Sequence, residues 1–137
     1  MTSSVSSVPA RTVILLVDDE PLIHQILRAM LDHLGRPSRS AYSGEEALEM
    51  LGAGLEPALV ILDMDMPGLG GAATLPRLQA LRPELPVLVA TGRTREAMTP
   101  ILQAHPTVGF LAKPFDLAEL RCGLAEALPK AEAQGAV

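Results

Sequence analysis

Three acids, a hydroxyl and an amine each stand at the end of an apolar run of this sequence: Asp18, Asp19, Asp63, Thr91 and Lys113. Carboxylates that crowd together raise one another's pKa unless a cation lies between them. Oxygen ligands without His or Cys favour a hard ion, and Mg²⁺ suits a half-exposed site in which the ion keeps several waters. The hydroxyl and the amine would then suit the oxygens of a phosphoryl group, which an Asp carboxylate can accept as an acyl phosphate.

The apolar runs that precede these side chains predict one buried sheet. Continuous apolar runs, typical of strands covered on both faces, occupy residues 12–17 (TVILLV), 58–62, 86–91 (PVLVAT) and 109–112. Segments with helical spacing separate these runs, and the polar residues 36–42 fit a weak edge strand. This alternation predicts the fold class α/β: a doubly wound, five-stranded parallel sheet, (βα)5 flavodoxin-like, with helices on both faces. Ligands gather outside the carboxyl ends of such strands, so the polar side chains should meet at one edge.

Helical spacing and capping signals predict helices over residues 22–34, 43–51, 70–81 and 116–128. Pro76 lies inside one of them, where a proline removes a backbone hydrogen bond, so we expect a late start near Thr74 or a kink. Thr99-Pro100 fits a cap followed by a first helical residue. This dipeptide predicts a further helix of roughly residues 100–104, preceded by a long, mobile loop at 92–98.

Composition argues against several function classes. The net charge of −5 disfavours nucleic acid as a direct partner, because phosphate binding needs clustered Lys and Arg. No apolar run approaches the roughly 20 residues of a membrane helix, so no membrane partner is expected. The single Cys122 excludes an intramolecular disulfide and suits a reducing cytoplasm. We expect residues 1–10 to be a disordered tail without signal-peptide features, 11–128 one folded domain, and 129–137 a tail or linker.

Four motifs, in this order and at this spacing, closely resemble the receiver domain of two-component response regulators. They are Val17-Asp18-Asp19-Glu20, Leu62-Asp63-Met64-Asp65-Met66-Pro67, Thr91-Gly92 and Lys113-Pro114-Phe115. The resemblance covers roughly residues 12–128. It implies a cytoplasmic phosphoacceptor that is not an enzyme beyond its slow self-dephosphorylation. Asp63 would take a phosphoryl group from a sensor histidine kinase or a phosphotransfer protein, and would thereby switch a protein-interaction surface toward an unknown downstream protein or output domain.

The resemblance also implies a metal site. Asp19 and Asp63 would bind Mg²⁺ directly, together with the backbone carbonyl of Asp65. Asp18 would act on the ion through water.

A switch follows from the same resemblance. Thr91 and Lys113 would contact the phosphoryl group, and in the family this hydroxyl moves inward together with an aromatic of the last strand, a position that Phe110 matches. Phe110 could equally be a core residue. The chain departs from the family pattern at Gly70-Gly71 and Pro106, and these departures put the usual output surface in doubt.

Two variable positions flank the chemistry. Asp65 lies two residues after the acceptor, and Arg93 lies two residues after Thr91. We hypothesise that this tuning pair meets across the phosphoryl group, restricts attacking water and slows the loss of phosphate. The alternative is two solvated side chains, because exposed pairs contribute little.

Two features beside the acidic pair have functional and ordinary explanations. Apolar Leu22 and Ile26 lie outside the main helical stripe, so they either pack under a neighbouring helix or dock a kinase. The histidines do not cluster at metal-ligand spacing, and His24, although near the acidic pair, is expected to be a solvated helix residue.

Two rival functions remain open. Asp63-Met64-Asp65 after an apolar strand also resembles haloacid-dehalogenase-type phosphatases, with Asp63 as nucleophile and Asp65 as general acid. That family, however, carries its acidic pair late in the chain and has no Met66-Pro67 after the second Asp. The other rival is a receiver-fold interaction module that is never phosphorylated, against which the complete set of acids, hydroxyl and amine argues.

Overall fold

The computed structural model describes residues 13–66 and 70–128, which form one sheet and its covering helices. The strands are β1 (Ile14–Val17), β2 (Ser38–Ala41), β3 (Leu59–Asp63), β4 (Val87–Thr91) and β5 (Gly109–Ala112). The helices are α2 (Pro21–His33), α3 (Gly44–Gly52), α4 (Gly70–Leu81), α5 (Arg95–Ala104) and α6 (Leu117–Ala127). All strand pairs are parallel, in the order β2-β1-β3-β4-β5. The predicted α/β fold class is therefore confirmed. The two predicted tails lie outside the described residues.

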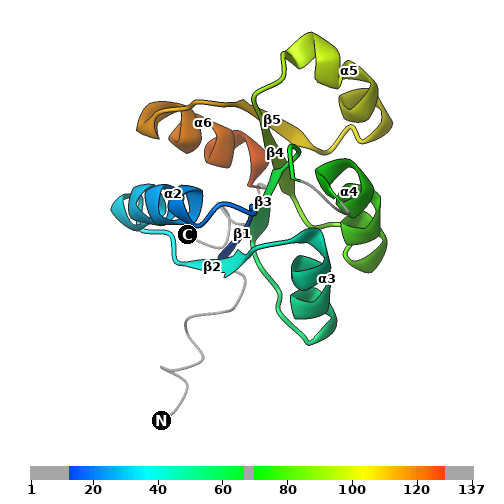
Figure 1. Ribbon diagram of the computed structural model, residues 1–137, viewed down its shortest axis with the longest axis horizontal. Helices are drawn as coiled ribbons and strands as arrows, with labels where there is room; N and C mark the ends of the chain where they lie inside the picture. The colour runs from blue at the N-terminus through cyan, green and yellow to red at the C-terminus, as the bar shows by residue number, and fades with distance from the viewer. Residues whose placement is uncertain (1–12, 67–69, 129–137) are drawn as a thin grey trace.

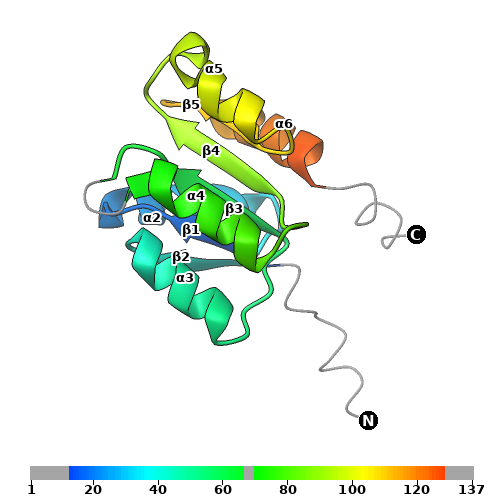
Figure 2. The same cartoon turned by 90° about the vertical axis from the view of Figure 1, so that its right-hand side faces the viewer.

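Helices cover both faces of the sheet. Helices α2 and α6 lie on one face, and α3, α4 and α5 lie on the other (Figure 1 and Figure 2). Strand residues alternate between the two sides. Leu15 and Val17 of β1 belong to the core beneath α3–α5, whereas Ile14 and Leu16 belong to the core beneath α2 and α6. This period of two continues to the strand ends and decides toward which face a terminal side chain turns.

Alternation separates two of the predicted site residues. Asp63 is two residues beyond Ile61, which belongs to the α2–α6 core. Thr91, at the end of the neighbouring strand, is two residues beyond Val89, which belongs to the α3–α5 core. The pleat therefore directs Asp63 and Thr91 toward opposite faces of the sheet.

Helix α5 starts earlier than the sequence suggests, so the predicted start at Pro100 is wrong. The true N-cap is Thr94, whose hydroxyl accepts a hydrogen bond from the backbone N–H of Ala97 at 3.1 Å. A proline inside a helix costs about 3 kcal/mol. The Thr94 cap and the fully buried side chain of Met98, at 0% exposure, offset that cost.

The predicted loop over residues 92–98 is correspondingly too long, because α5 includes its second half. Thr99 is not a cap. Its hydroxyl donates to the backbone oxygen of Arg95 at 3.1 Å, one turn earlier in the same helix. The propensity of Thr-Pro for a helix start was outweighed by a second Thr-based cap five residues upstream.

Helix α4 begins at Gly70, so a late start near Thr74 is wrong and the kink at Pro76 stays a prediction. The first turn can lie against the end of β3 because Gly71 has no side chain. A Cβ atom there would be 2.5 Å from the Asp63 backbone oxygen and 2.6 Å from the Cα of Met64. The Thr74 hydroxyl, fully buried, donates to the Gly70 carbonyl at 2.6 Å and supports this turn.

The remaining expectations about elements are confirmed. Pro21 occupies the start of α2, and Ser43 caps α3 by accepting from the N–H of Glu46. Asp116 and Glu119 form the predicted capping box of α6. β2 is an edge strand that pairs with β1 alone. Within the described ranges, none of the helices has the length and apolar character that crossing a bilayer requires.

Candidate functional site

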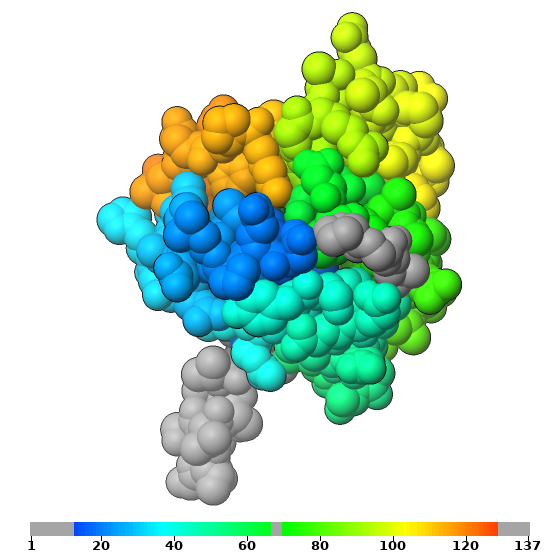
Figure 3. Space-filling model, viewed as in Figure 1, coloured from blue at the N-terminus to red at the C-terminus, as the bar shows by residue number. Residues whose placement is uncertain are grey.

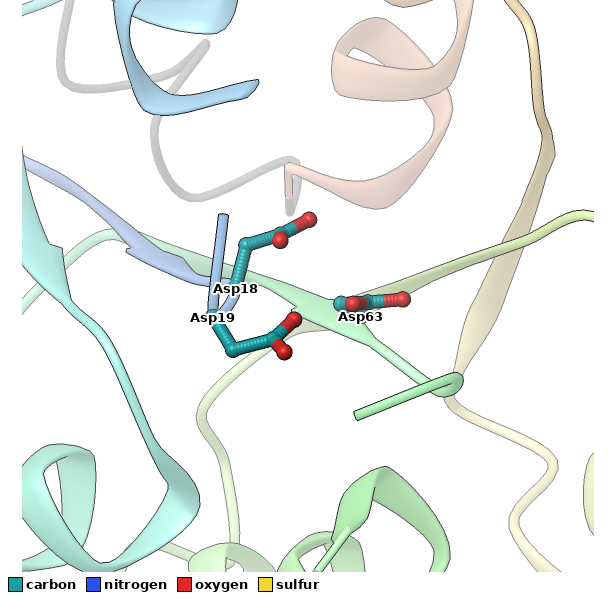
Figure 4. Close-up of side chains that lie close together, drawn as sticks. All are labelled: Asp18, Asp19 and Asp63. Atoms are coloured by element: carbon teal, nitrogen blue, oxygen red, sulfur yellow. The ribbon is translucent and has the colours of Figure 1, made fainter. Parts of the chain in front are cut away.

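The carboxylates of Asp18, Asp19 and Asp63 meet at one edge of the sheet. Each offers an oxygen, and these three oxygens lie within 4.8 Å of one another. Asp18 and Asp19 follow β1 and Asp63 ends β3, two strands that pair side by side at the centre of the sheet (Figure 4). The predicted convergence of these acids is therefore observed.

Short turns fix the two buried acids of this cluster. Asp18 and Asp63 are 3% and 4% exposed, respectively. The Asp18 carboxylate accepts from the N–H of Glu20 at 2.9 Å, and the Asp63 carboxylate accepts from the N–H of Asp65 at 3.0 Å. Each bond joins a side chain to a backbone donor two residues on, which is the local geometry that Asp favours where a strand ends.

Lys113 reaches this cluster from the far edge of the sheet. Its Nζ atom lies 3.0 Å from an Asp63 oxygen and 3.4 Å from an Asp18 oxygen. Its backbone N–H donates to the carbonyl of Thr91 at 2.8 Å, which holds the end of β5 against β4. The side chain then passes over the end of β4 to reach β3.

The electrostatics of the cluster are unbalanced. Burial raises the pKa of Asp18, and the charge of Asp63 raises it further against the opposing effects of the Glu20 N–H and of Lys113. Burial acts to lower the pKa of Lys113, but its bonds to Asp63 and its attraction to both acids outweigh burial, and the net shift is upward. One ammonium group cannot neutralise three carboxylates, so the cluster has room for a further positive charge.

Thr91 belongs to a second centre, built around the side chain of Asp65. The Thr91 hydroxyl donates to the Asp65 carboxylate, whose two oxygens lie 2.9 and 3.2 Å from the hydroxyl oxygen. The Gly92 N–H donates to the same carboxylate at 3.0 Å. The predicted meeting of the hydroxyl with Lys113 and the acids is therefore incomplete, because Thr91 is engaged elsewhere.

Arg93 lies beside Asp65, as the hypothesis of a tuning pair requires. Its Nε atom is 3.4 Å from an Asp65 oxygen, with both side chains partly exposed. Burial acts to raise the pKa of Asp65. The Gly92 N–H, the Thr91 hydroxyl and the charges of Lys113 and Arg93 lower this pKa by more, so it lies below the ordinary value. Of the groups that hold Asp65 ionised, the Gly92 N–H, the Thr91 hydroxyl and Arg93 are specific to Asp65, whereas Lys113 also acts on Asp63.

Phe110 lies on β5 and packs, partly buried, against the α3–α5 core. The guanidinium of Arg95 lies 5.3 Å from the centre of its ring, within cation–π range. Sequence reasoning missed Arg95, because its helix was expected to begin five residues later. The start of α5 therefore contacts the residue predicted to be the aromatic switch.

His24 is buried, not solvated, so that prediction is wrong. It is 2% exposed, its Nε2 lies 2.7 Å from the backbone oxygen of Asp18, and its ring lies 4.3 Å from the ring of Tyr42. A signal for this existed in the sequence. His24 shares a helical stripe with Leu27 and Leu31, both of which are buried in α2.

Two apolar side chains on the outer face of α2 are open to solvent. Leu22 is 63% exposed and Ile26 is 49% exposed. Figure 3 shows the start of α2 (blue) on the face turned to the viewer, between α6 and α3. Burial under a neighbouring helix, the ordinary explanation for these two side chains, is therefore wrong.

Comparisons with known proteins agree with this geometry. Residues 14–125 match the family model of the response regulator receiver domain. The transcriptional activator protein ExaE of Pseudomonas putida is 41% identical over 102 residues, which are 73% of this chain and 47% of that protein. The sensor kinase CckA of Brucella abortus is 33% identical over 118 residues, 85% of this chain but 12% of that protein. The chain thus spans about half or less of the length of these curated relatives.

Solved structures show the same fold. The chemotaxis protein CheY4 of Vibrio cholerae superposes with a TM-score of 0.75 at 28% identity, covering 85% of this chain and 98% of that one. The response regulator TrrA of Thermotoga maritima, solved in complex with Mg(2+)-BeF, gives a TM-score of 0.75 at 29% identity with the same coverage. With a family match over most of its length, the chain belongs to the response regulator receiver domain family.

Proposed function

We propose that Asp63 is the phosphoacceptor of this receiver domain and that its donor is a sensor histidine kinase or a phosphotransfer protein. An Asp63 carboxylate oxygen attacks the phosphorus of a phosphohistidine. A P–O bond forms, and the P–N bond breaks with its electron pair passing to the imidazole. The product is an acyl phosphate on Asp63 and a free histidine on the donor.

The observation that carries this proposal is the position of Lys113. Its ammonium group lies 3.0 Å from an Asp63 oxygen although the two residues are 50 positions apart. A fixed positive charge beside the attacking carboxylate stabilises the charge on the transferring phosphoryl group. Both described hydrogen bonds of the Asp63 side chain, from Lys113 and from the Asp65 N–H, fall on Oδ1. We therefore assign the attack to Oδ2.

Mg²⁺ fits the donor set of the cluster. Three carboxylates from two neighbouring strand ends lie close enough to share one ion, and Lys113 is the cation that the described residues bring to them. Asp19 and Asp63 would bind the ion directly with the backbone carbonyl of Asp65, and Asp18 would act through water. The ion would supply positive charge to the phosphoryl oxygens.

Receiver domains of response regulators are normally phosphoacceptors and not enzymes, and we assign the same status to this chain. A haloacid-dehalogenase-type phosphatase would need Asp65 to act as a general acid. The Asp65 side chain instead accepts hydrogen bonds from Thr91 and Gly92, and its lowered pKa disfavours the protonated form that an acid needs.

The exposed apolar face of α2 is our candidate for kinase docking. Leu22 and Ile26 lie in the first two turns of α2, which begins directly after the strand-end acids Asp18 and Asp19, and both are exposed to a partner helix. We expect Ile26→Glu to slow phosphotransfer from a kinase and to leave phosphorylation by a small donor intact. Equal kinase rates in the two proteins would refute this assignment. A cytoplasmic location and an unidentified downstream protein or output domain complete the proposal.

A small acyl phosphate donor tests the acceptor directly. With Mg²⁺ present, the intact mass of the wild-type protein should rise by one phosphoryl group, and Asp63→Asn should show no increase. Asp65→Asn serves as the matched control, because it neutralises a carboxylate two residues away and keeps the backbone carbonyl. Phosphorylation of Asp63→Asn at the wild-type level would overturn the proposal.

A further inference from the structure

The Thr91 hydroxyl is already occupied in this structure. Thr91 is 0% exposed, and its hydroxyl donates to the Asp65 carboxylate at 2.9 Å and accepts from the N–H of Arg93 at 3.1 Å. The carboxylate also accepts from the Gly92 N–H at 3.0 Å. Asp65 thereby holds Thr91 and Gly92, the first residues of the segment that joins β4 to α5, by hydrogen bonds. Its carboxylate also lies close to the Arg93 side chain.

A hydroxyl carries one proton and can donate it to one acceptor at a time. If the Thr91 hydroxyl is to bond a phosphoryl group on Asp63, it must first leave Asp65. The acceptor it leaves is a carboxylate, and hydrogen bonds to charged groups are the stronger class. Moving the Thr91 hydroxyl away from Asp65 therefore costs free energy, and the new interactions with the phosphoryl group must offset this cost.

The pleat of the sheet strengthens this competition. Thr91 and Asp63 end neighbouring strands, but alternation sends their side chains toward opposite faces. Asp65, two residues past the end of β3, lies on the side toward which Thr91 turns, as the hydrogen bonds show. The unmodified fold thus presents Asp65, and not Asp63, as the natural partner of the hydroxyl.

The segment that Asp65 holds leads directly into α5. Arg95, the first residue of that helix, lies over the ring of Phe110 at 5.3 Å from its centre. Release of Thr91 and Gly92 would loosen the connection between β4 and α5. A looser connection would in turn alter the contact between Arg95 and Phe110.

From these contacts we propose that the Asp65 side chain is a positioning residue that locks Thr91 in the unphosphorylated arrangement by competing with the phosphoryl group for its hydroxyl. The proposal rests on the proposed function of Asp63. It differs from the hypothesis of water exclusion by Asp65 and Arg93, because the lock acts before phosphorylation, on the equilibrium of the switch. Loss of the lock should therefore make the phosphorylated arrangement easier to reach.

Loss of the Asp65 charge alone would also favour a bound anion, so the experiment must separate charge from hydrogen bonding. We would measure the affinity of beryllofluoride with Mg²⁺, a stable mimic of the aspartyl phosphate, in four proteins: wild type, Asp65→Ala, Thr91→Ala and the double variant. A charge effect persists when Thr91 lacks its hydroxyl. A lock requires that hydroxyl and disappears with it.

In the Thr91 background, we expect Asp65→Ala to tighten beryllofluoride binding by about tenfold, the size of one hydrogen bond to a charged group. In the Thr91→Ala background, the same substitution should change the affinity by about twofold or less. Glu96→Ala is the charge control, because it removes an exposed carboxylate near the start of α5 that is not bonded to Thr91. It should leave the affinity near the wild-type value.

A second readout follows Thr91 itself. The NMR shifts of the Thr91 methyl group in unliganded Asp65→Ala should move part of the way toward those of the beryllofluoride-bound wild type. Asp65→Asn should lie between, because its amide oxygen can still accept from Thr91 while its amide nitrogen faces the Gly92 N–H.

The outcomes separate the two proposals. A wild-type protein that fails to bind beryllofluoride with Mg²⁺ overturns the assignment of Asp63 and the lock together. A wild-type protein that binds it, with equal effects of Asp65→Ala in both Thr91 backgrounds or with no movement of the Thr91 methyl signal, overturns the lock alone.

Discussion

Two carboxylates that stand two residues apart, Asp63 and Asp65, lie in opposite electrostatic settings. Asp63 is 4% exposed and shares its surroundings with two further acids and one lysine. Asp65 is more exposed and is surrounded by donors: the Thr91 hydroxyl, the Gly92 N–H and the Arg93 guanidinium.

These settings determine what each carboxylate can do. Where acids outnumber cations, a carboxylate has spare capacity for a metal ion and a phosphoryl group, which is the setting of Asp63. A carboxylate that accepts hydrogen bonds on several sides has its charge satisfied, and it then fixes the position of the residues that donate to it. This is the setting of Asp65. Local sequence is nearly the same for both, and the partners supplied by distant strands decide the outcome.

The largest expected effect comes from removing Lys113, the cation that residues 13–66 and 70–128 place beside Asp63. Lys113→Met should slow phosphorylation by a small acyl phosphate donor by about 100-fold, because the charge beside the attacking oxygen is lost. Initial rates from intact mass measure this. Lys130→Met, at the only other lysine of the sequence, is the matched control and should keep the wild-type rate. A wild-type rate in Lys113→Met would show that the charge of Lys113 does not assist phosphorylation of Asp63.

A smaller effect is expected from a substitution that crowds the backbone of Asp63 and Met64, next to the two carboxylates. Gly71→Ala places a Cβ atom 2.5 Å from the Asp63 backbone oxygen and 2.6 Å from the Met64 Cα, so α4 or the end of β3 must shift. We expect a loss of about 1–3 kcal/mol in the free energy of unfolding, measured by denaturant titration. Gly52→Ala, where nothing lies within 4 Å, is the control. Equal stability of the two variants would show that this contact is not constrained.

The raised pKa of Asp18, which is caused first by burial, predicts a pH dependence with a definite sign. A carboxyl whose folded-state pKa is raised binds more protons folded than unfolded. Its effect therefore lowers stability as the pH rises from the ordinary carboxyl pKa through the raised one. Mg²⁺ favours the ionised form, so the increase in Tm caused by Mg²⁺ should grow over that same window.

Asp18→Asn sharpens this test. The variant should lose much of the pH dependence in its response to Mg²⁺ and bind the ion about tenfold more weakly, the usual effect of losing an outer ligand. Its metal-free form should be at least as stable as the metal-free wild type at neutral pH. An unchanged Mg²⁺ affinity would show that Asp18 takes no part in the site.

The smallest effect belongs to the Asp65 setting. Arg93→Ala removes a partly exposed ion pair, so the free energy of unfolding should change by no more than about 1 kcal/mol. If Arg93 and Asp65 restrict attacking water, Arg93→Ala should shorten the lifetime of the phosphorylated protein by a few-fold. The decay of the phosphorylated form measures this, and unchanged lifetimes in both Arg93→Ala and Asp65→Ala would remove the tuning hypothesis.

The central sheet and the acidic cluster could be predicted because the signals are local. An apolar run that stops at Asp63 or at Lys113 marks a strand end, and parallel topology brings strand ends to one edge. The convergence of the three acids needed only this placement, whereas the roles proposed for them came from the resemblance to receiver domains.

The parts that escaped prediction depend on contacts between distant residues. Both helices with internal prolines begin earlier than expected, since the Gly71 contact with β3 and the buried Met98 lie outside any local window. The partner of Thr91 was missed for a similar reason. Its hydrogen bond to Asp65 spans 26 residues and depends on which face of the sheet each side chain meets.

Site mapping of the phosphoryl group is the most direct test of the Asp63 assignment. The protein would be treated with a small acyl phosphate donor in the presence and in the absence of Mg²⁺, the acyl phosphate trapped by borohydride reduction, and the peptides sequenced by mass spectrometry. We expect modification at Asp63 alone, and only with the divalent ion. Modification at Asp65 or another acid, or equal modification of Asp63 without the ion, would contradict the assignment of the strand-end acids to a metal-dependent phosphoacceptor site.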